Sequence, residues 1–490
     1  MTTTVSQQSA ALAERMQRAV FLDGEFVPAE GEPLAVTDKA TGETLGHAAT
    51  ATAAEVDRAV AGALGAQRQW HALPATERAA ILRRGGAVLE REAGRFKQLL
   101  IREGGAVGAK AEGEIAASVV EFFQAADLAT TPLGEVIPSG QRGRVNLVER
   151  RPVGVVGLIT AWNAPVHIAM RVLAPAIALG NAVVLKPAPE TPFTGGLMLA
   201  EVLAEAGLPP GVVQVVTGGP AGPALVTHPD VAMIHFTGSE DTGRRINEAA
   251  APLLKRVALE LGGNNASVVL SDADLDLAAR CGAASSFGHQ GQVCIATGRH
   301  VVLADVAEEY IGRLARHAAG LTVGDPFVSE VDLGPMLSAR QVDKALAMMT
   351  SSIERGARLV EGGTADGVFL RPTVVDRVRP GMQLHDEEVF APIAPVTVVD
   401  SVEEALAIVN GTRFGLSTSI FGRDLDHAWA VADRVRAGMV HVNDGTALHE
   451  CHVPFGGTGA SGLGDDLGGR ASIDLLTERR WTSLQRKTLP

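Results

Sequence analysis

The sequence of 490 residues contains little cysteine, a single tyrosine and no long apolar run. Its three cysteines, Cys281, Cys294 and Cys451, lack CxxC spacing, which argues against a disulfide framework and against a structural zinc site. The apolar segments are short or are interrupted by polar residues such as Arg171 and Asn181, so none is typical of a membrane span. These absences predict a protein of the reducing cytoplasm with no bound metal.

The sequence also lacks a basic excess, a signal peptide and the usual glycine fingerprint for dinucleotides. Lys and Arg number 43 against 56 Asp and Glu, a formal net charge of −13, which argues against a nucleic-acid or membrane partner. Residues 1–20 have no continuous apolar centre, so they do not resemble a secretory leader. No GxGxxG motif follows a predicted strand, so any nucleotide site must be built differently.

What the sequence does contain is an alternation of helix-like and strand-like segments. Apolar residues at helical spacing predict two amphipathic helices over 53–73 and 75–101. Further along, β-branched runs alternate with Ala-rich helical segments, which predicts parallel sheets in an α/β fold of two or three domains. The first series has strands at 153–159, 182–185, 212–216 and 233–236, and the second has strands at 266–270, 300–303 and 395–399 and a helix at 275–286.

A cysteine and a glutamate stand out as candidate reactive groups. Cys294 ends the Gly-containing segment Phe287–Cys294, where its sulfur could meet a substrate. A lone cysteine is more often an inert buried side chain, so the pattern alone leaves both interpretations open. Glu260 follows a short apolar strand and precedes two glycines, which makes it a candidate general base.

Three polar residues follow predicted strands at the carboxyl edge of the first sheet, where open α/β sheets bind ligands. Asn163 could stabilise an oxyanion or could be an ordinary turn residue. Lys186 could reach a nucleotide or could lie in solvent. Ser239 is placed to cap a helix whose N-terminus could bind an anion, although an ordinary capped helix fits this segment equally well.

Together these motifs resemble the aldehyde dehydrogenase superfamily, and the resemblance extends from about Phe21 to the C-terminus. The motifs occur in the family order: Trp162-Asn163, Lys186-Pro187, Phe236–Gly243, Glu260–Gly263, Gly291–Cys294, Glu388–Pro392, Gly438–Asn443, and Pro454–Gly457 with Ser461-Gly462.

The resemblance implies two Rossmann-like parallel α/β domains with a small β oligomerisation arm. The cofactor-binding domain would comprise residues 1–139 and 153–259, and the catalytic domain residues 260–447. The arm and C-terminal segment would comprise residues 140–152 and 448–490, and would assemble the chain into a homodimer or homotetramer.

The resemblance also implies the chemistry of the site. Cys294 would attack the aldehyde carbon, Asn163 would stabilise the oxyanion, and Glu260 would activate the water that hydrolyses the thioester. The implied cofactor contacts are Ile159, Thr160, Ala161, Trp162, Lys186, Ala188, Pro189, Gly219, Phe236, Thr237, Gly238, Ser239, Thr242, Gly243, Leu261, Gly262, Glu388 and Phe390. The implied substrate pocket comprises His167, Met170, Arg171, His289, Val293, Ile295 and Cys451.

Two departures from the family pattern refine these expectations. Pro189 occupies a position where many NAD-preferring relatives carry Glu, so we expect NAD to be the cofactor and NADP to be tolerated. His289 stands where much of the superfamily has Asn, and with Pro189 it resembles the benzaldehyde dehydrogenase branch. This branch implies an aromatic aldehyde substrate. A buried structural histidine is the simpler interpretation of His289 itself.

Other functions stay open at this point. An aliphatic aldehyde or semialdehyde dehydrogenase would use the same residues, and coenzyme A could replace water in releasing the thioester. A cofactor-free cysteine hydrolase could pair Cys294 with His289, and a non-catalytic member of the fold could have lost its activity. A metal held by His449, Cys451 and His452 would need a ligand from a second segment.

Overall fold

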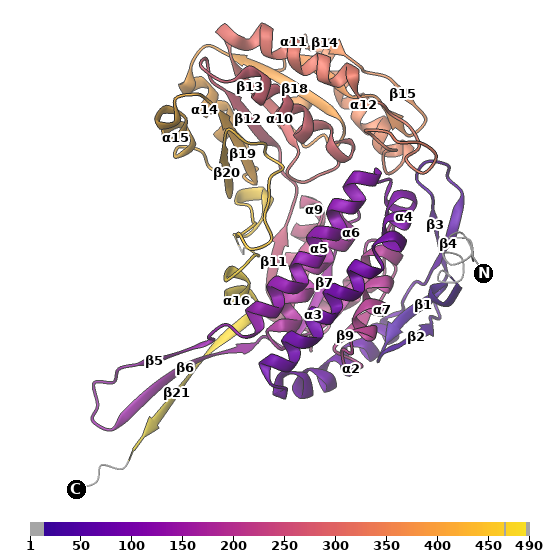
Figure 1. Ribbon diagram of the computed structural model, residues 1–490, viewed down its shortest axis with the longest axis vertical. Coiled ribbons are helices and arrows are strands. Elements are labelled where there is room, and N and C mark those ends of the chain that lie inside the picture. Colours follow the sequence, from indigo (N-terminus) through magenta and orange to yellow (C-terminus); the bar gives the residue numbers. More distant parts are fainter. Residues whose placement is uncertain (1–13, 465–466, 487–490) are drawn as a thin grey trace.

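The computed structural model describes residues 14–464 and 467–486, which form two α/β domains and an extended arm (Figure 1). Within these ranges, no helix has both the length and the apolar character needed to cross a membrane.

The first domain is built on a seven-stranded sheet in the order β11-β10-β7-β8-β9-β1-β2. Strands β7, β8 and β10 are parallel and almost wholly buried, because helices cover both faces of the sheet. The strands are β1 (Ala19–Leu22), β2 (Glu25–Pro28), β7 (Val155–Ile159), β8 (Ala182–Lys186), β9 (Val213–Val215), β10 (Met233–Thr237) and β11 (Arg256–Glu260). The helices are α2 (Ala53–Ala72), α3 (Ala75–Arg91), α4 (Ala93–Gly104), α5 (Gly108–Ala129), α6 (Pro165–Ala178), α7 (Met198–Glu205), α8 (Ala221–Thr227) and α9 (Glu240–Ala250).

The helix predicted over 75–101 is in fact two helices, α3 and α4, separated at Glu92. The prediction of one helix was wrong because the apolar spacing continues across the junction, where Phe96 and Leu100 are buried in the same core as Leu89. The residue next to the break, Ala93, is followed by Gly94, which has low helix propensity.

The second domain has a seven-stranded sheet in the order β14-β17-β18-β13-β12-β19-β20. Its central strands are again parallel, and α10 (Leu275–Phe287) and α11 (Ala304–Gly320) pack on one another beside the sheet (Figure 1). The strands are β12 (Asn265–Val269), β13 (Thr297–Leu303), β14 (Arg358–Glu361), β17 (Thr373–Asp376), β18 (Ile393–Val399), β19 (Ser417–Phe421) and β20 (Met439–Val442). The other helices are α12 (Ala339–Glu354), α13 (Gln383–Asp386), α14 (Val402–Asn410) and α15 (Leu425–Ala432). Two short hairpins complete the chain: β3 (Leu34–Thr37) with β4 (Thr44–Ala48), and β15 (Ala365–Asp366) with β16 (Phe369–Leu370).

The arm is a three-stranded antiparallel sheet that projects away from both domains (Figure 1). It consists of β5 (Gly134–Ile137), β6 (Arg144–Pro152) and β21 (Thr477–Gln485). The arm therefore begins with β5, before the boundary expected at residue 140. The C-terminal segment is also divided, because α16 (Ala471–Leu476) and Leu467 belong to the hydrophobic core of the first domain.

Candidate active site

The loop that carries Cys294 begins with a tight left-handed turn after α10. His289, Gln290 and Gly291 have φ angles of 48°, 56° and 65°, and only glycine adopts this region without strain. A Cβ atom on Gly291 would lie 2.3 Å from the carbonyl oxygen of Ala391, so no other residue fits. The Gln290 amide secures the turn by donating to the carbonyls of Gly105 at 2.9 Å and Pro335 at 2.6 Å.

Cys294 faces a cavity of about 310 Å³ between the two domains. The cavity wall combines the three predicted catalytic residues, Cys294, Glu260 and Asn163, with predicted cofactor and substrate residues. These further lining residues are Ala161, Trp162, His167, Arg171, Thr237, Gly238, Ser239, Leu261, Gly262, Val293, Ile295, Glu388 and Phe390. The structure thus brings together residues from segments that are more than 200 positions apart in the sequence.

Asn163 is held rigidly beside the cysteine loop. Its side-chain amide donates to the Gln292 carbonyl at 2.9 Å, and its own carbonyl accepts from Lys110 Nζ at 2.7 Å. Lys110 pairs with Glu114, whose carboxylate accepts from the backbone N–H of Val166 at 2.8 Å, at the start of α6. Because an amide NH₂ has two hydrogens, Asn163 keeps one N–H available for an oxyanion.

Asn265 is a functional residue that the sequence analysis did not identify. Its side-chain amide donates to the carbonyls of Cys294 at 2.8 Å and Ala296 at 2.7 Å, and its oxygen accepts from the N–H of Ser417. The signal that could have revealed it is a pair of asparagines at the start of a strand that is otherwise apolar and fully buried.

Glu260 ends β11, at the edge of the first sheet that faces the second domain. Its main chain pairs with β10, and Gly238 N–H donates to its carbonyl at 3.0 Å. The residue is 8% exposed and lines the cavity with Cys294. The sheet therefore places a buried carboxylate on the same cavity as the thiol.

Glu388 approaches the same cavity from the second domain. Its carboxylate accepts from the N–H of Gly263 at 3.1 Å, and a Cβ atom on Gly262 would lie 2.1 Å from its Oε2. Burial raises the pKa of Glu388 to about 7, and the hydrogen bond from Gly263 opposes that rise.

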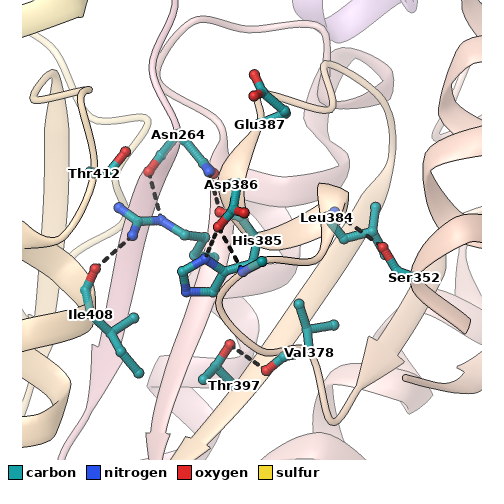
Figure 2. A network of polar contacts seen from close by, with 12 residues as sticks. Asn264, Ser352, Val378, Leu384, His385, Asp386, Glu387, Thr397, Ile408 and Thr412 are labelled. Carbon is teal, nitrogen blue, oxygen red and sulfur yellow. Dashed lines mark hydrogen bonds and ion pairs between the residues drawn. The ribbon is translucent and has the colours of Figure 1, made fainter. Parts of the chain in front are cut away.

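The segment that carries Glu388 is anchored by a polar network beneath it (Figure 2). Asn264 donates to the His385 carbonyl at 2.7 Å, and Leu384 N–H donates to the Ser352 hydroxyl at 3.2 Å. Arg299 donates to the carbonyls of Asn264 at 3.0 Å and Ile408 at 2.9 Å. The position of the Glu388 carboxylate is therefore fixed by the core of the second domain.

The electrostatic environment of Cys294 disfavours its thiolate. Burial raises the pKa of the Cys294 thiol to about 12, and the nearby carboxylates of Glu388 and Glu260 contribute to the rise. Cys294 is therefore a protonated thiol at neutral pH.

The other end of the cavity has features that fit a dinucleotide. Ser239 caps α9, but its hydroxyl contacts the Thr242 hydroxyl at 3.0 Å instead of a backbone N–H. The first N–H groups of this helix can therefore face an anion. The rings of Trp162 and Phe390 meet edge to face at 5.8 Å and form an aromatic wall suited to a nicotinamide.

Several predicted cofactor residues are not part of the lining of this cavity. Lys186 is 7% exposed, its ammonium donates to the Pro187 carbonyl at 3.1 Å, and burial lowers its pKa to about 8. The other predicted cofactor residues outside the lining of this cavity are Ile159, Thr160, Ala188, Pro189, Gly219, Phe236, Thr242 and Gly243.

Three predicted substrate residues are also absent from the cavity lining. Met170 is fully buried in the core of the first domain, because α6 turns His167 and Arg171 toward the cavity. His289 is buried behind Asn163, and burial and Lys110 lower its pKa well below the usual value. Cys451 donates to the Ala117 carbonyl at 3.7 Å.

One group of described residues could approach the geometry of a metal site. Glu121, His167 and Cys451 present ligand atoms within 4.8 Å of one another, so of the three residues considered from the sequence only Cys451 belongs to this group. The guanidinium of Arg171 lies 3.7 Å from Glu121 and opposes binding of a cation there.

One cavity combines a thiol, a carboxylate and a rigid amide, and a helix N-terminus and an aromatic wall lie beyond them. This arrangement defines an enzyme with a cysteine nucleophile beside a nucleotide site. Residues 26–482 match the aldehyde dehydrogenase family, and the chain belongs to that family. It is therefore an oxidoreductase that acts on small aldehydes with NAD(P), as the sequence motifs predicted.

Individual relatives agree with this assignment. The chain is 45% identical to a benzaldehyde dehydrogenase [NAD(+)] of Pseudomonas putida, over 94% of this chain and 95% of the relative. It is 44% identical to a vanillin dehydrogenase of Amycolatopsis sp., with the same coverage. Its fold matches the crystal structure of an E. coli NADP dependent enzyme with a TM-score of 0.94 and 34% identity, covering 97% of this chain and 99% of that chain.

The raised thiol pKa makes the reactivity of Cys294 depend on Glu388. In the cofactor-free protein, we expect alkylation of Cys294 by iodoacetamide to be slow at pH 7 and to accelerate up to at least pH 10. Above about pH 7 Glu388 is ionised, so the Glu388→Gln variant should have a lower thiol pKa and should react faster at pH 8 to 9. Mass spectrometry of the Cys294 peptide measures the rate.

The same digest provides the control for this experiment. Cys281 also has a raised pKa, but the causes are burial and Asp444, so its rate should not respond to Glu388→Gln. Equal alkylation of Cys294 in the two proteins at pH 9 would contradict the proposed charge effect.

Proposed function

We propose that this chain oxidises an aromatic aldehyde to its carboxylic acid with NAD, and tolerates NADP. The observation that carries the proposal is the convergence of Cys294, Glu260 and Asn163 on one cavity. The names of the two relatives above, a benzaldehyde and a vanillin dehydrogenase, support the aromatic class.

In the proposed mechanism, Cys294 attacks the aldehyde carbon while its proton leaves to a base. Because burial raises the pKa of the thiol, this proton must be released as the carbon–sulfur bond forms, and solvent water accepts it. Glu260, a carboxylate on the same cavity, is the base for the later hydrolysis step. Carbon–sulfur bond formation converts the carbonyl oxygen to an oxyanion. The Asn163 amide and the Cys294 N–H would stabilise that charge, typically by about 3 to 4 kcal/mol per donor.

A nicotinamide cofactor, when bound, would supply the acceptor for the hydride of the thiohemiacetal carbon, and Cys294 would then carry a thioester. Glu260 then removes a proton from water, and the resulting hydroxide attacks the thioester carbon. The carbon–sulfur bond breaks, the carboxylic acid departs, and the sulfur recovers its proton. A base is needed only for water, so Glu260 favours hydrolysis over release by coenzyme A.

The cofactor would lie along the end of the cavity formed by Trp162, Ser239, Glu388 and Phe390. The N-terminus of α9 would bind the pyrophosphate. Glu388 would accept hydrogen bonds from the nicotinamide ribose hydroxyls, and Lys186 would contact the adenosine ribose.

The substrate class is tested by the absorbance of reduced nicotinamide with benzaldehyde, vanillin, salicylaldehyde, hexanal and betaine aldehyde. We expect the aromatic aldehydes to have the highest kcat/KM values. Faster turnover of hexanal than of every aromatic would indicate an aliphatic aldehyde dehydrogenase. Ester hydrolysis without any nicotinamide reduction would indicate a cysteine hydrolase instead.

The role of Glu260 predicts a specific defect in deacylation. In Glu260→Gln, thioester hydrolysis should slow by about 10² to 10⁴-fold, while a first turnover of nicotinamide reduction persists. Rapid mixing should show a burst, and intact mass spectrometry should show the acyl group on Cys294. Cys294→Ser is the matched control, and it should show neither. A burst-free Glu260→Gln protein that releases acid at the normal rate would contradict this role.

Pro189 predicts a weak discrimination between cofactors. We expect the kcat/KM values for NAD and NADP to differ by no more than about tenfold, since one ribose contact is worth about 1.4 kcal/mol. Pro189→Glu should raise the preference for NAD by about tenfold or more, because a carboxylate there would repel a 2′-phosphate. Pro189→Gln, which lacks the charge, is the control. A native preference for NAD above about a thousandfold would contradict the proposal.

The arm predicts a homodimer or homotetramer. It presents exposed apolar side chains, with Val136 72% and Trp481 69% exposed, which another subunit would cover. Sedimentation velocity at micromolar concentration should show a dimer or tetramer and no monomer. Deleting residues 477–490, which include β21, should shift the distribution toward monomer. A native protein that sediments only as monomer would contradict the assembly.

The chemistry also favours a reducing compartment. Cys281, Cys294 and Cys451 are all free thiols, and the nucleophile must stay reduced to work. We therefore place the enzyme in the cytoplasm.

A further inference from the structure

The cavity wall beyond Asn163 contains an arginine whose hydrogen-bonding capacity is only partly used. Arg171 lies on α6, one turn and about 6 Å along the axis beyond His167. It is 8% exposed, and its guanidinium lies 4.8 Å from the centre of the Phe455 ring. Arg171 and Asn163 both line the cavity that Cys294 faces.

The guanidinium is held by two backbone contacts that leave other donors unused. Nη2 donates to the carbonyls of Leu467 at 3.1 Å and Val453 at 3.3 Å. In the described part of the chain, Nε and Nη1 are buried and make no hydrogen bond. Nη1 forms an ion pair with Glu121 at 3.7 Å, which is longer than a hydrogen bond.

Two histidines that line the same cavity, His235 and His167, also have ring nitrogens without a hydrogen-bond partner among the described residues. His235 on β10 is 1% exposed, lines the cavity, and has no hydrogen-bond partner for either ring nitrogen within the described residues. Burial lowers its pKa to about 3, and Arg171 adds to the shift, so the ring is neutral and keeps one acceptor and one donor. His167 contacts His449 ring to ring, with 3.2 Å between the two Nε2 atoms.

These groups form a polar patch in a cavity whose other walls are largely apolar, including Ile168, Val172, Phe455 and Leu467. Leaving a buried donor unsatisfied is costly, and a site built around such a donor rejects a ligand that cannot satisfy it. An aromatic ring with its formyl group at Cys294 would fill the apolar part. An oxygen on the ring, remote from the formyl group, would complete the bonding of the patch.

We propose that Arg171 is a specificity-determining residue that donates a hydrogen bond to an oxygen substituent at the meta or para position of an aromatic aldehyde. This inference rests on the proposed function and narrows its substrate class to ring-oxygenated aldehydes. The shared chemistry is a hydrogen-bond-accepting oxygen, which a hydroxyl group or a methoxy group can supply.

Kinetics of the native enzyme and of Arg171→Met test the inference. The panel is benzaldehyde, 4-methylbenzaldehyde, 3- and 4-hydroxybenzaldehyde, 4-methoxybenzaldehyde and 2-hydroxybenzaldehyde. In the native enzyme, the better of the 3- and 4-hydroxy compounds should exceed 4-methylbenzaldehyde in kcat/KM by about 10- to 100-fold. In Arg171→Met this ratio should fall to within about threefold of unity. The ratio of kcat/KM for 2-hydroxybenzaldehyde to that for 4-methylbenzaldehyde should be the same in the native enzyme and in Arg171→Met, because the hydroxyl oxygen of this compound lies beside the formyl group.

The methoxy compound separates the two oxygen sources. If the enzyme prefers the methoxy and hydroxyl compounds equally, a substrate oxygen that only accepts a hydrogen bond from Arg171 is sufficient. If it prefers only the hydroxyl compounds, the substrate hydroxyl also donates a hydrogen bond to His235. Both outcomes support the inference. Arg316→Met makes the same chemical change on the exposed face of α11 and should leave every ratio unchanged.

Binding of the acid product gives a readout that does not depend on turnover. The native protein should bind the hydroxybenzoate that matches the preferred aldehyde at least about tenfold more tightly than 4-methylbenzoate, and Arg171→Met should lose this difference. If Arg171→Met fails to fold, Arg171→Lys retains the cation and should lose part of the selectivity. A native enzyme that treats methyl and hydroxyl compounds alike would overturn the inference and leave aldehyde oxidation intact. A native enzyme that oxidises no aldehyde would instead refute the proposed function.

Discussion

The site depends on one constraint, which is that the backbone from His289 to Ala296 must hold a left-handed turn and then present the half-buried thiol of Cys294. Such a turn is unfavourable for two of its three residues, so surrounding hydrogen bonds must impose it. The side chains of Gln290, Asn265 and Asn163 supply these bonds, each to main-chain carbonyls. Because Asn163 and Gly105 belong to the first domain, the catalytic loop of the second domain is shaped partly by its neighbour.

The same burial that fixes the geometry determines the protonation states. It keeps the Cys294 thiol protonated, raises the pKa of Glu388 to about 7 and keeps the His235 ring uncharged. A protonated thiol resists oxidation and adventitious alkylation, because the thiolate is the reactive form. The protein thus confines nucleophilicity to the moment when a base and a substrate are both in place.

Much of this arrangement was accessible from the sequence, because local signals and the ordered motifs agree. The strands that were predicted in the two sheets, β7, β8, β9, β10, β12, β13 and β18, lie close to their predicted ranges, since β-branched runs between Ala-rich segments are a strong signal for buried parallel strands. The edge strands of the sheets, such as β2 and β14, had no predicted range. The break between α3 and α4 could not be predicted from the sequence. Apolar spacing indicates which face of a helix is buried, but it does not indicate whether the helix continues without interruption. Asn265 was missed because its role is to donate hydrogen bonds to carbonyls of a distant loop. Met170 was assigned to the pocket because its position in the sequence does not reveal which face of the helix meets the cavity. The unused donors of Arg171 depend on tertiary contacts with Glu121, Phe455 and Leu467 and have no sequence signature.

The path of the C-terminal segment has a consequence for how the protein is made. Leu467 and α16 complete a core whose other members come mostly from residues 16–258, although the whole second domain lies between them in the sequence. On the ribosome, the first domain therefore emerges early but lacks part of its interior until translation is nearly finished. The second domain can fold in that interval as a continuous unit, whereas the first must wait with apolar surface exposed, a state that favours chaperone binding or aggregation.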